Sequence, residues 1–226
     1  EARKGYLDLL DYENHDPNGI NNTVNRQNFT WWSHYGYKNR YFVDLALVES
    51  ASNRLAPGTK WNFSPTLSAA WVLSKENFME DATWIDFLKL RASAGIINVD
   101  NLPGDEVWAY YAQQYATSGG GYAFDSGWNS EFGRTYLGMM ATANPTNEKA
   151  YKYNVGVDAK FFGGLDVTLD LWKEHRTDIW VTSDGKYSAV LGMDTPYENV
   201  GVVDSWGVEL GLDYNKKIGD FAFNIG

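Results

Sequence analysis

The strongest constraint on the fold is an alternation of apolar and polar residues that recurs along the chain. In residues 151–161, YKYNVGVDAKF, the odd positions are apolar: Tyr153, Val155, Val157, Ala159 and Phe161. Successive side chains of a β-strand point to opposite faces, so this period of two predicts a strand with one apolar and one polar face. The alternation resumes after Gly163-Gly164, and two glycines that can both take positive φ predict a hairpin.

The same alternation predicts an all-β, antiparallel fold of roughly eight strands. It also appears in residues 41–47, 67–71, 88–94, 165–180, 208–214 and 221–225. Sustained helical spacing is absent, and residues 74–84 have room for one helical turn. The glycine-rich residues 117–127 lack a P-loop lysine and a strand-to-helix setting, so we interpret them as a flexible loop tip.

The connections between these strands alternate between short turns and long loops, the longest covering about residues 97–149. This asymmetry is typical of a transmembrane β-barrel, with short turns on one side of the membrane and long loops outside. The apolar face would then meet lipid and the polar face a water-filled lumen. Eight strands cannot close around a wide lumen, so we predict that residues 1–226 belong to one larger barrel domain. Both ends of the chain look cut.

Aromatic residues account for 16% of the chain, which excludes a disordered protein. Many stand near expected strand ends, where aromatic girdles of membrane barrels lie: Trp31, Trp32, Tyr41, Phe42, Tyr151, Trp172 and Trp180. The net charge of −10 argues against a nucleic-acid partner. Cysteine is absent, which excludes disulfides, thiol catalysis and Cys-ligated zinc.

The chain shows no pattern that predicts an enzyme, a metal site or a cofactor. His15, His34 and His175 lack metal-ligand spacing, and the acidic residues 11–22 fail the spacing of a calcium loop. Carboxylates are numerous, but nothing singles out the pair that a glycosidase needs.

Several stretches resemble SusC/RagA-type TonB-dependent outer-membrane transporters. They are residues 61–79 (WNFSPTLSAAWVLSKENFM), 85–98 (IDFLKLRASAGIIN), 144–179 and 199–215 (NVGVVDSWGVELGLDYN). The resemblance covers most of residues 28–226 in order. It departs from the family pattern at VESASNRL in residues 48–55 and at DSWG in residues 204–207.

The resemblance implies a 22-stranded barrel in the bacterial outer membrane, with a plug and TonB box that residues 1–226 do not include. It implies energy-coupled import of a large nutrient, an oligosaccharide or a peptide. It further implies a SusD-like surface lipoprotein, the TonB complex and outer-membrane lipid as partners, and it allows a dimer of transporter–lipoprotein pairs. The alternative reading is a secreted soluble β-sandwich, a carbohydrate-binding or glycoside-hydrolase-associated module. A passive porin fits the motifs less well.

The long connection of residues 97–149 holds the candidate substrate-binding residues. They are the aromatic Trp108, Tyr110, Tyr111, Tyr122 and Trp128 and the acidic Asp105 and Asp125. Aromatic rings stack on sugars or peptide side chains, and carboxylates bond to hydroxyls or amines, so this mixture predicts a ligand site. The same aromatics would equally serve to pack the loop on itself or against the lipoprotein.

Overall fold

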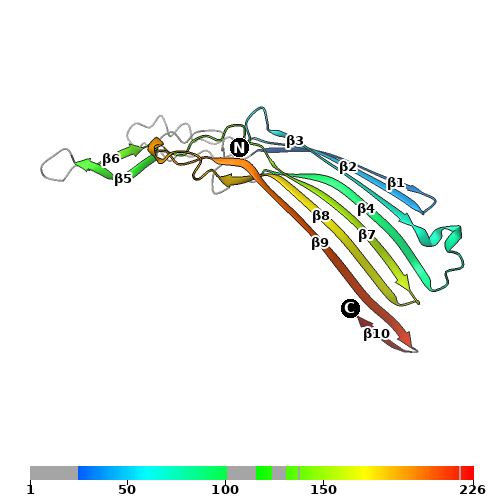
Figure 1. Ribbon diagram of the computed structural model, residues 1–226. Coiled ribbons are helices and arrows are strands. Elements are labelled where there is room, and N and C mark those ends of the chain that lie inside the picture. The colour runs from blue at the N-terminus through cyan, green and yellow to red at the C-terminus, as the bar shows by residue number, and fades with distance from the viewer. Residues whose placement is uncertain (1–24, 101–115, 124–130, 137, 219) are drawn as a thin grey trace.

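The chain folds into an open antiparallel sheet of eight strands, which confirms the predicted all-β class. The computed structural model describes residues 25–100, 116–123, 131–136, 138–218 and 220–226. The strand order in the large sheet is β1-β2-β3-β4-β7-β8-β9-β10, and β5 and β6 pair separately. Figure 1 shows the large sheet as one curved layer, with the β5–β6 hairpin extending away from it.

The strands of the large sheet differ widely in length. They are β1 (Arg26–Tyr37), β2 (Tyr41–Ser52), β3 (Trp61–Val72), β4 (Ile85–Val99), β7 (Glu148–Phe161), β8 (Leu165–Thr182), β9 (Tyr197–Ile218) and β10 (Phe221–Ile225). Helical structure among the described residues is limited to the 3-10 turns η1 (Leu73–Lys75), η2 (Asn77–Met79) and η3 (Ala189–Leu191). No helix in this part of the chain is long and apolar enough to cross a membrane.

Two expectations about the loops need correction. The 97–149 connection is not wholly irregular, because it contains the hairpin of β5 (Ala116–Ala123) and β6 (Glu131–Tyr136). The glycine-rich residues 117–127, expected as a loop tip, therefore begin within a strand.

Cross-strand register keeps the two faces of the sheet separate across the strands. One row of paired residues is apolar from end to end: Tyr37, Tyr41, Trp71, Leu90, Val157, Leu169 and Leu210. The adjacent row contains Arg91, Gly156, Asp170 and Glu209. We call the face with Val157 and Leu169 the apolar face and the face with Arg91 and Asp170 the polar face. The predicted alternation is confirmed.

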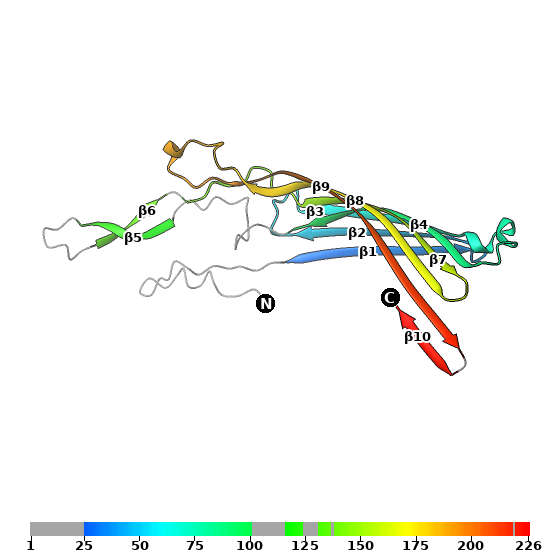
Figure 2. The ribbon, with the colours of Figure 1, turned by 60° about the horizontal axis from the view of Figure 1, so that its bottom comes forward.

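Among the described residues, no second layer covers the apolar face. Large side chains on it stay exposed, including Leu210 at 62% and Leu212 at 52%. The buried hydrophobic residues in the described part are few and scattered: Ala51, Leu55, Val72, Ala150, Ala159 and Trp180. Viewed from a second direction, the large sheet remains a single layer (Figure 2). Within the described residues, the sheet therefore has no extended hydrophobic core.

Aromatic pairs stand on the apolar face near both ends of the strands. Near the short turns, Tyr41 stacks on Trp71 with centroids 6.1 Å apart, and Trp84 stacks on Phe161 at 5.7 Å. Near the long loops, Phe29 stacks on Trp61 at 6.2 Å. Three of the predicted girdle residues are misplaced, because Trp32, Phe42 and Trp172 lie on the polar face. Trp180 is buried against Tyr197.

The β7–β8 turn uses its two glycines differently from the prediction. Positive φ occurs at Phe162 (53°) and Gly163 (64°), and Gly164 is not among the positive-φ residues. Gly164 lies instead against β9, where its carbonyl accepts a hydrogen bond from the Asn215 amide at 2.8 Å. An added Cβ at Gly164 would collide with the Asn215 carbonyl oxygen, whereas nothing lies within 4 Å of one at Gly163. Gly164 is thus required for close approach of two backbones.

We expect Gly164→Ala to destabilise the protein by about 1–3 kcal/mol, because the methyl group meets backbone rather than a movable side chain. Gly163→Asn should be nearly neutral, since asparagine adopts positive φ readily. Guanidinium titration of the full-length protein measures both changes. Equal midpoints for Gly164→Ala and the unmodified protein would contradict this account of the turn.

Candidate functional site

A charged cluster on the polar face ties three strands together. The Arg91 guanidinium donates to Asp170 at 2.7 Å and 2.5 Å and to Asp158 at 3.1 Å. Lys89 lies 3.4 Å from the same Asp158 carboxylate. Arg91 reaches Asp170 across Gly156, where an added Cβ would lie 2.6 Å from the Arg91 Cζ atom. Such two-pronged pairing fixes both charges in position.

A gap in the backbone ladder opens the sheet at its loop end. Pairing between β3 and β4 starts at Thr66↔Gly95, so the β3 residues from Trp61 to Pro65 have no partner on β4. Proline has no N–H to donate and interrupts a ladder where it stands. The Asn98 side chain replaces the missing bonds, donating to the Phe63 carbonyl at 2.9 Å and to the Ser64 hydroxyl at 2.7 Å.

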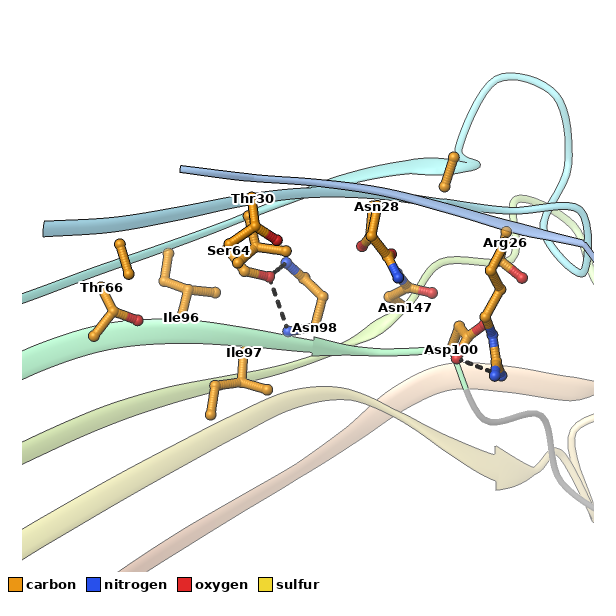
Figure 3. A pocket seen from close by; sticks show the side chains of 15 residues that line it. Arg26, Asn28, Thr30, Ser64, Thr66, Ile96, Ile97, Asn98, Asp100 and Asn147 are labelled. Carbon is orange, nitrogen blue, oxygen red and sulfur yellow. Dashed lines mark hydrogen bonds and ion pairs between the residues drawn. The ribbon is translucent and has the colours of Figure 1, made fainter. Parts of the chain in front are cut away.

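A cavity of about 460 Å³ lies beside this gap, mostly on the polar face (Figure 3). Its lining combines hydroxyl and amide groups with apolar residues, among them Val48, Ile96 and Ile97. The polar side chains come from β1, β2, β3, β4 and the segment before β7: Asn28, Thr30, Ser50, Ser52, Ser64, Thr66, Asn98 and Asn147. Such groups both donate and accept hydrogen bonds, so the cavity suits a neutral polar ligand.

Asn147 is held in this cavity by the backbone around it. The Asn199 side chain accepts from the Thr146 amide at 3.0 Å and donates to the Thr146 carbonyl at 3.1 Å. The preceding carbonyl, of Pro145, accepts a 2.6 Å hydrogen bond from Thr59. Asn147 itself is only 3% exposed, and its Oδ1 atom has no hydrogen-bond partner within the described structure. Figure 3 shows the side chain beside Asn28.

An ion pair is the charged part of the cavity. Arg26 donates to Asp100 through two nitrogens, at 2.7 Å and 3.0 Å. Burial alone would raise the pKa of Asp100, but hydrogen bonds from Arg26 and Ser52 outweigh it and hold that pKa below its ordinary value. The two charges compensate each other, so the cavity presents no net charge to a ligand.

The predicted substrate-binding residues lie almost wholly outside the described residues. Only Tyr122 falls within them, in β5, where its backbone pairs with Phe132 of β6. The residues that sequence reasoning missed are Asn147 and the Ser64–Asn98 pair. The residue that could have predicted the gap between β3 and β4 was Pro65, because a proline within a strand has no N–H for the backbone ladder. His34 and His175 instead pair with Asp44 and Asp204, and the described residues contain no cluster suited to a metal ion.

Comparison with known proteins agrees with this geometry. Residues 12–226 match the family model described as TonB dependent receptor-like, beta-barrel. TonB-dependent receptor P39 of Formosa agariphila is 27% identical over 184 residues, covering 79% of this chain and 16% of that protein. TonB-dependent receptor SusC of Bacteroides thetaiotaomicron is 24% identical over 201 residues, covering 84% of this chain and 19% of that protein.

The fold is shared with solved structures. The structure of the RagAB peptide transporter superposes with a TM-score of 0.71 at 17% identity, covering 87% of this chain and 20% of that chain. The chain thus spans less than a fifth of the length of its curated relatives P39 and SusC.

We expect Arg91→Gln to destabilise the sheet by roughly 1.5–3 kcal/mol, because it leaves Asp158 and Asp170 side by side without their main donor. The matched control is Lys160→Gln. Lys160 pairs with Asp166 at 3.2 Å, and since both side chains are about 40% exposed, this change should cost below about 1 kcal/mol. Denaturant unfolding of the full-length protein compares the two, and similar losses would contradict a structural role for the Arg91 cluster.

Proposed function

The chain belongs to the TonB dependent receptor-like β-barrel family, and on this premise we propose that it forms part of the wall of an energy-coupled nutrient importer. Proteins of this family lie in the bacterial outer membrane, where we place this chain too. The observation that carries the proposal is the exposed apolar face, kept in register across the strands, opposite a polar face with its own ion pairs. Lipid on one side and a watery passage on the other satisfy both faces.

The connections indicate which end of the wall faces outward. The β1–β2, β7–β8 and β9–β10 turns lie at one end, and the connections of residues 53–60, 100–147 and 183–196 lie at the other. Because barrels carry short periplasmic turns and long extracellular loops, we place residues about 97–149 outside the cell. The 73–84 connection at the turn end is folded back by Glu76, which accepts bonds from Tyr41 at 2.7 Å and Trp71 at 3.0 Å.

The alternative of a soluble β-sandwich fails on the apolar face. A sandwich packs a second sheet there at a spacing of roughly 10 Å. In the described part the second sheet is the short β5–β6 hairpin, and Val155, Leu171 and Val208 remain at least 50% exposed. The exposed apolar face therefore favours a membrane wall over a secreted carbohydrate-binding module.

The proposed cargo is an oligosaccharide or a peptide, and the cavity beside Asn147 is its proposed contact on the wall. The neutral hydroxyl and amide lining supports a ligand rich in uncharged polar groups, which sugars and peptide backbones both supply. The aromatic and acidic residues of the 97–149 connection remain proposed contacts. A SusD-like lipoprotein and the TonB complex are the proposed partners, with a dimer of transporter–lipoprotein pairs as the proposed assembly.

Uptake by cells tests the proposal. We expect cells that express the full-length protein to take up labelled oligosaccharides or peptides, and dissipating the proton-motive force should abolish this uptake. Uptake that persists without the proton-motive force would contradict energy coupling and favour a passive pore.

Asn147→Leu tests the cavity. We expect the concentration for half-maximal uptake to rise about 5–10-fold, equivalent to roughly one lost hydrogen bond of 1–1.5 kcal/mol. Because the change removes the Nδ2 group as well as the unpaired Oδ1 atom, the unfolding midpoint is measured beside uptake, which separates a lost ligand contact from lost stability. Ser93→Ala, on the polar face but not among the residues that line the cavity, is the control. An unchanged dependence of uptake on substrate concentration for Asn147→Leu would show that the substrate does not contact this cavity during transport.

Leu169→Arg tests the membrane placement. Leu169 lies within the apolar rows, so the charge should destabilise the protein by about 2–4 kcal/mol in lipid vesicles. Thr168→Arg changes the neighbouring residue on the polar face and should be mild, because that face meets water. Reversible unfolding in vesicles measures both, and equal tolerance of arginine at the two positions would defeat the assignment of lipid to the apolar face.

A further inference from the structure

Lys173 differs from the other lysines of its neighbourhood. Lysines of β4 and β7 pair with carboxylates: Lys89 with Asp158, Lys149 with Asp178, Lys152 with Glu174 and Lys160 with Asp166. Lys173 of β8 is exposed and has no carboxylate partner among the described residues.

The position of Lys173 on the apolar face is set by register. It stands between Tyr153 of β7 and Trp206 of β9, which are its direct cross-strand neighbours. The rows toward the short turns are wholly apolar: Val155, Leu171 and Val208, then Val157, Leu169 and Leu210, then Ala159, Val167 and Leu212. The row toward the loops is Tyr151, His175 and Asp204, and the last two form a 2.9 Å pair.

Lys173 therefore lies at the loop-side boundary of the band formed by these three apolar rows. Tyrosine and tryptophan gather where hydrocarbon gives way to headgroups, because each has an apolar ring and a polar tip. A lysine at this depth extends its ammonium group into the headgroup layer while its carbon chain stays against apolar surface.

A trough runs below this row on the same face. A hollow of about 350 Å³ is lined by Tyr153, Lys173 and Trp206 on one side and Val155, Leu171 and Val208 on the other. It exists because the residues between these rows point to the polar face or have no side chain. Trp172 points away and lies over Gly207, where an added Cβ would come within 2.7 Å of its indole ring. The trough is apolar along its length and has the lysine at one edge.

We propose that this trough binds an anionic lipid of the outer leaflet, with the headgroup phosphate on the Lys173 ammonium. Tyr153 and Trp206, which flank Lys173 in the register and line the same hollow, carry a hydroxyl and an indole N–H as further donors, and an acyl chain lies along Val155, Leu171 and Val208. Charge complementarity and continuity with the apolar band argue for a lipid rather than a protein partner. The site rests on the membrane placement proposed above and not on the transport activity.

Native mass spectrometry of the full-length protein in detergent tests the site with dioleoylphosphatidylglycerol as the probe. Lys173→Gln should weaken binding of one lipid about fivefold, the effect of one lysine near a headgroup. Lys173→Arg should keep the affinity. Lys149→Gln, on the same face but already paired with Asp178, should leave it unchanged. Dioleoylglycerol, which has the same chains without the phosphate, should not occupy the site.

Three results would overturn the proposal. If Lys173→Gln and the unmodified protein bound phosphatidylglycerol equally well, Lys173 would not be part of the site. If dioleoylglycerol bound as well as phosphatidylglycerol, the phosphate would not be recognised. Displacement of the lipid by millimolar inorganic phosphate would make this a site for free phosphate. Heat-modified electrophoretic mobility shows that each variant is folded. Failure of the membrane placement itself would appear separately, as solubility of the full-length protein without detergent.

Discussion

The backbone hydrogen-bond ladder, and the register it fixes, is the constraint on which the rest of this structure depends. Because side chains alternate with a period of two, a slip of one residue in any pairing would turn a whole strand's apolar side chains onto the polar face. Register instead aligns Leu90, Val157, Leu169 and Leu210 across four strands. Because no second layer packs on the sheet in the described part of the chain, this alignment takes the place of a buried core in defining the fold.

The motifs that resemble transporter sequences correspond to contacts between distant segments. Asn199 holds the backbone of Thr146, which lies 53 residues earlier in the chain. Arg91 joins β4 to β7 and β8, and the small residue at Gly156 makes room for it. These residues mark the places where strands far apart in sequence are fixed to one another, so their pattern specifies geometry rather than a chemical step.

Alternation predicted β2, β3, β4, β7, β8, β9 and β10 and their faces, because period two is a local property of the chain, but it did not predict β1 or the β5–β6 hairpin. It failed where the period is broken. Asp178 takes a positive φ of 57°, and the β8–β9 register shifts between Arg176 and Trp180, so the orientation of Trp180 could not be read by counting. The cavity could not be predicted either. It depends on which strands become neighbours and on the segment before β7 reaching β1, neither of which is visible in a local pattern.

The interruption at Pro65 gives the wall a seam of lower mechanical resistance. Below Thr66, separating β3 from β4 would break backbone ladder bonds one after another. Above it, within the described structure, the two strands are joined by Asn98 alone, through its side chain to Phe63 and Ser64 and through its backbone N–H to the Ser64 hydroxyl at 3.3 Å, rather than by a ladder of backbone pairs. The neighbouring pairings of β2 with β3 and of β4 with β7 continue past this level, so the strands on either side stay intact. A load applied at the loop end would be relieved here first, as widening of one seam rather than unravelling of the sheet.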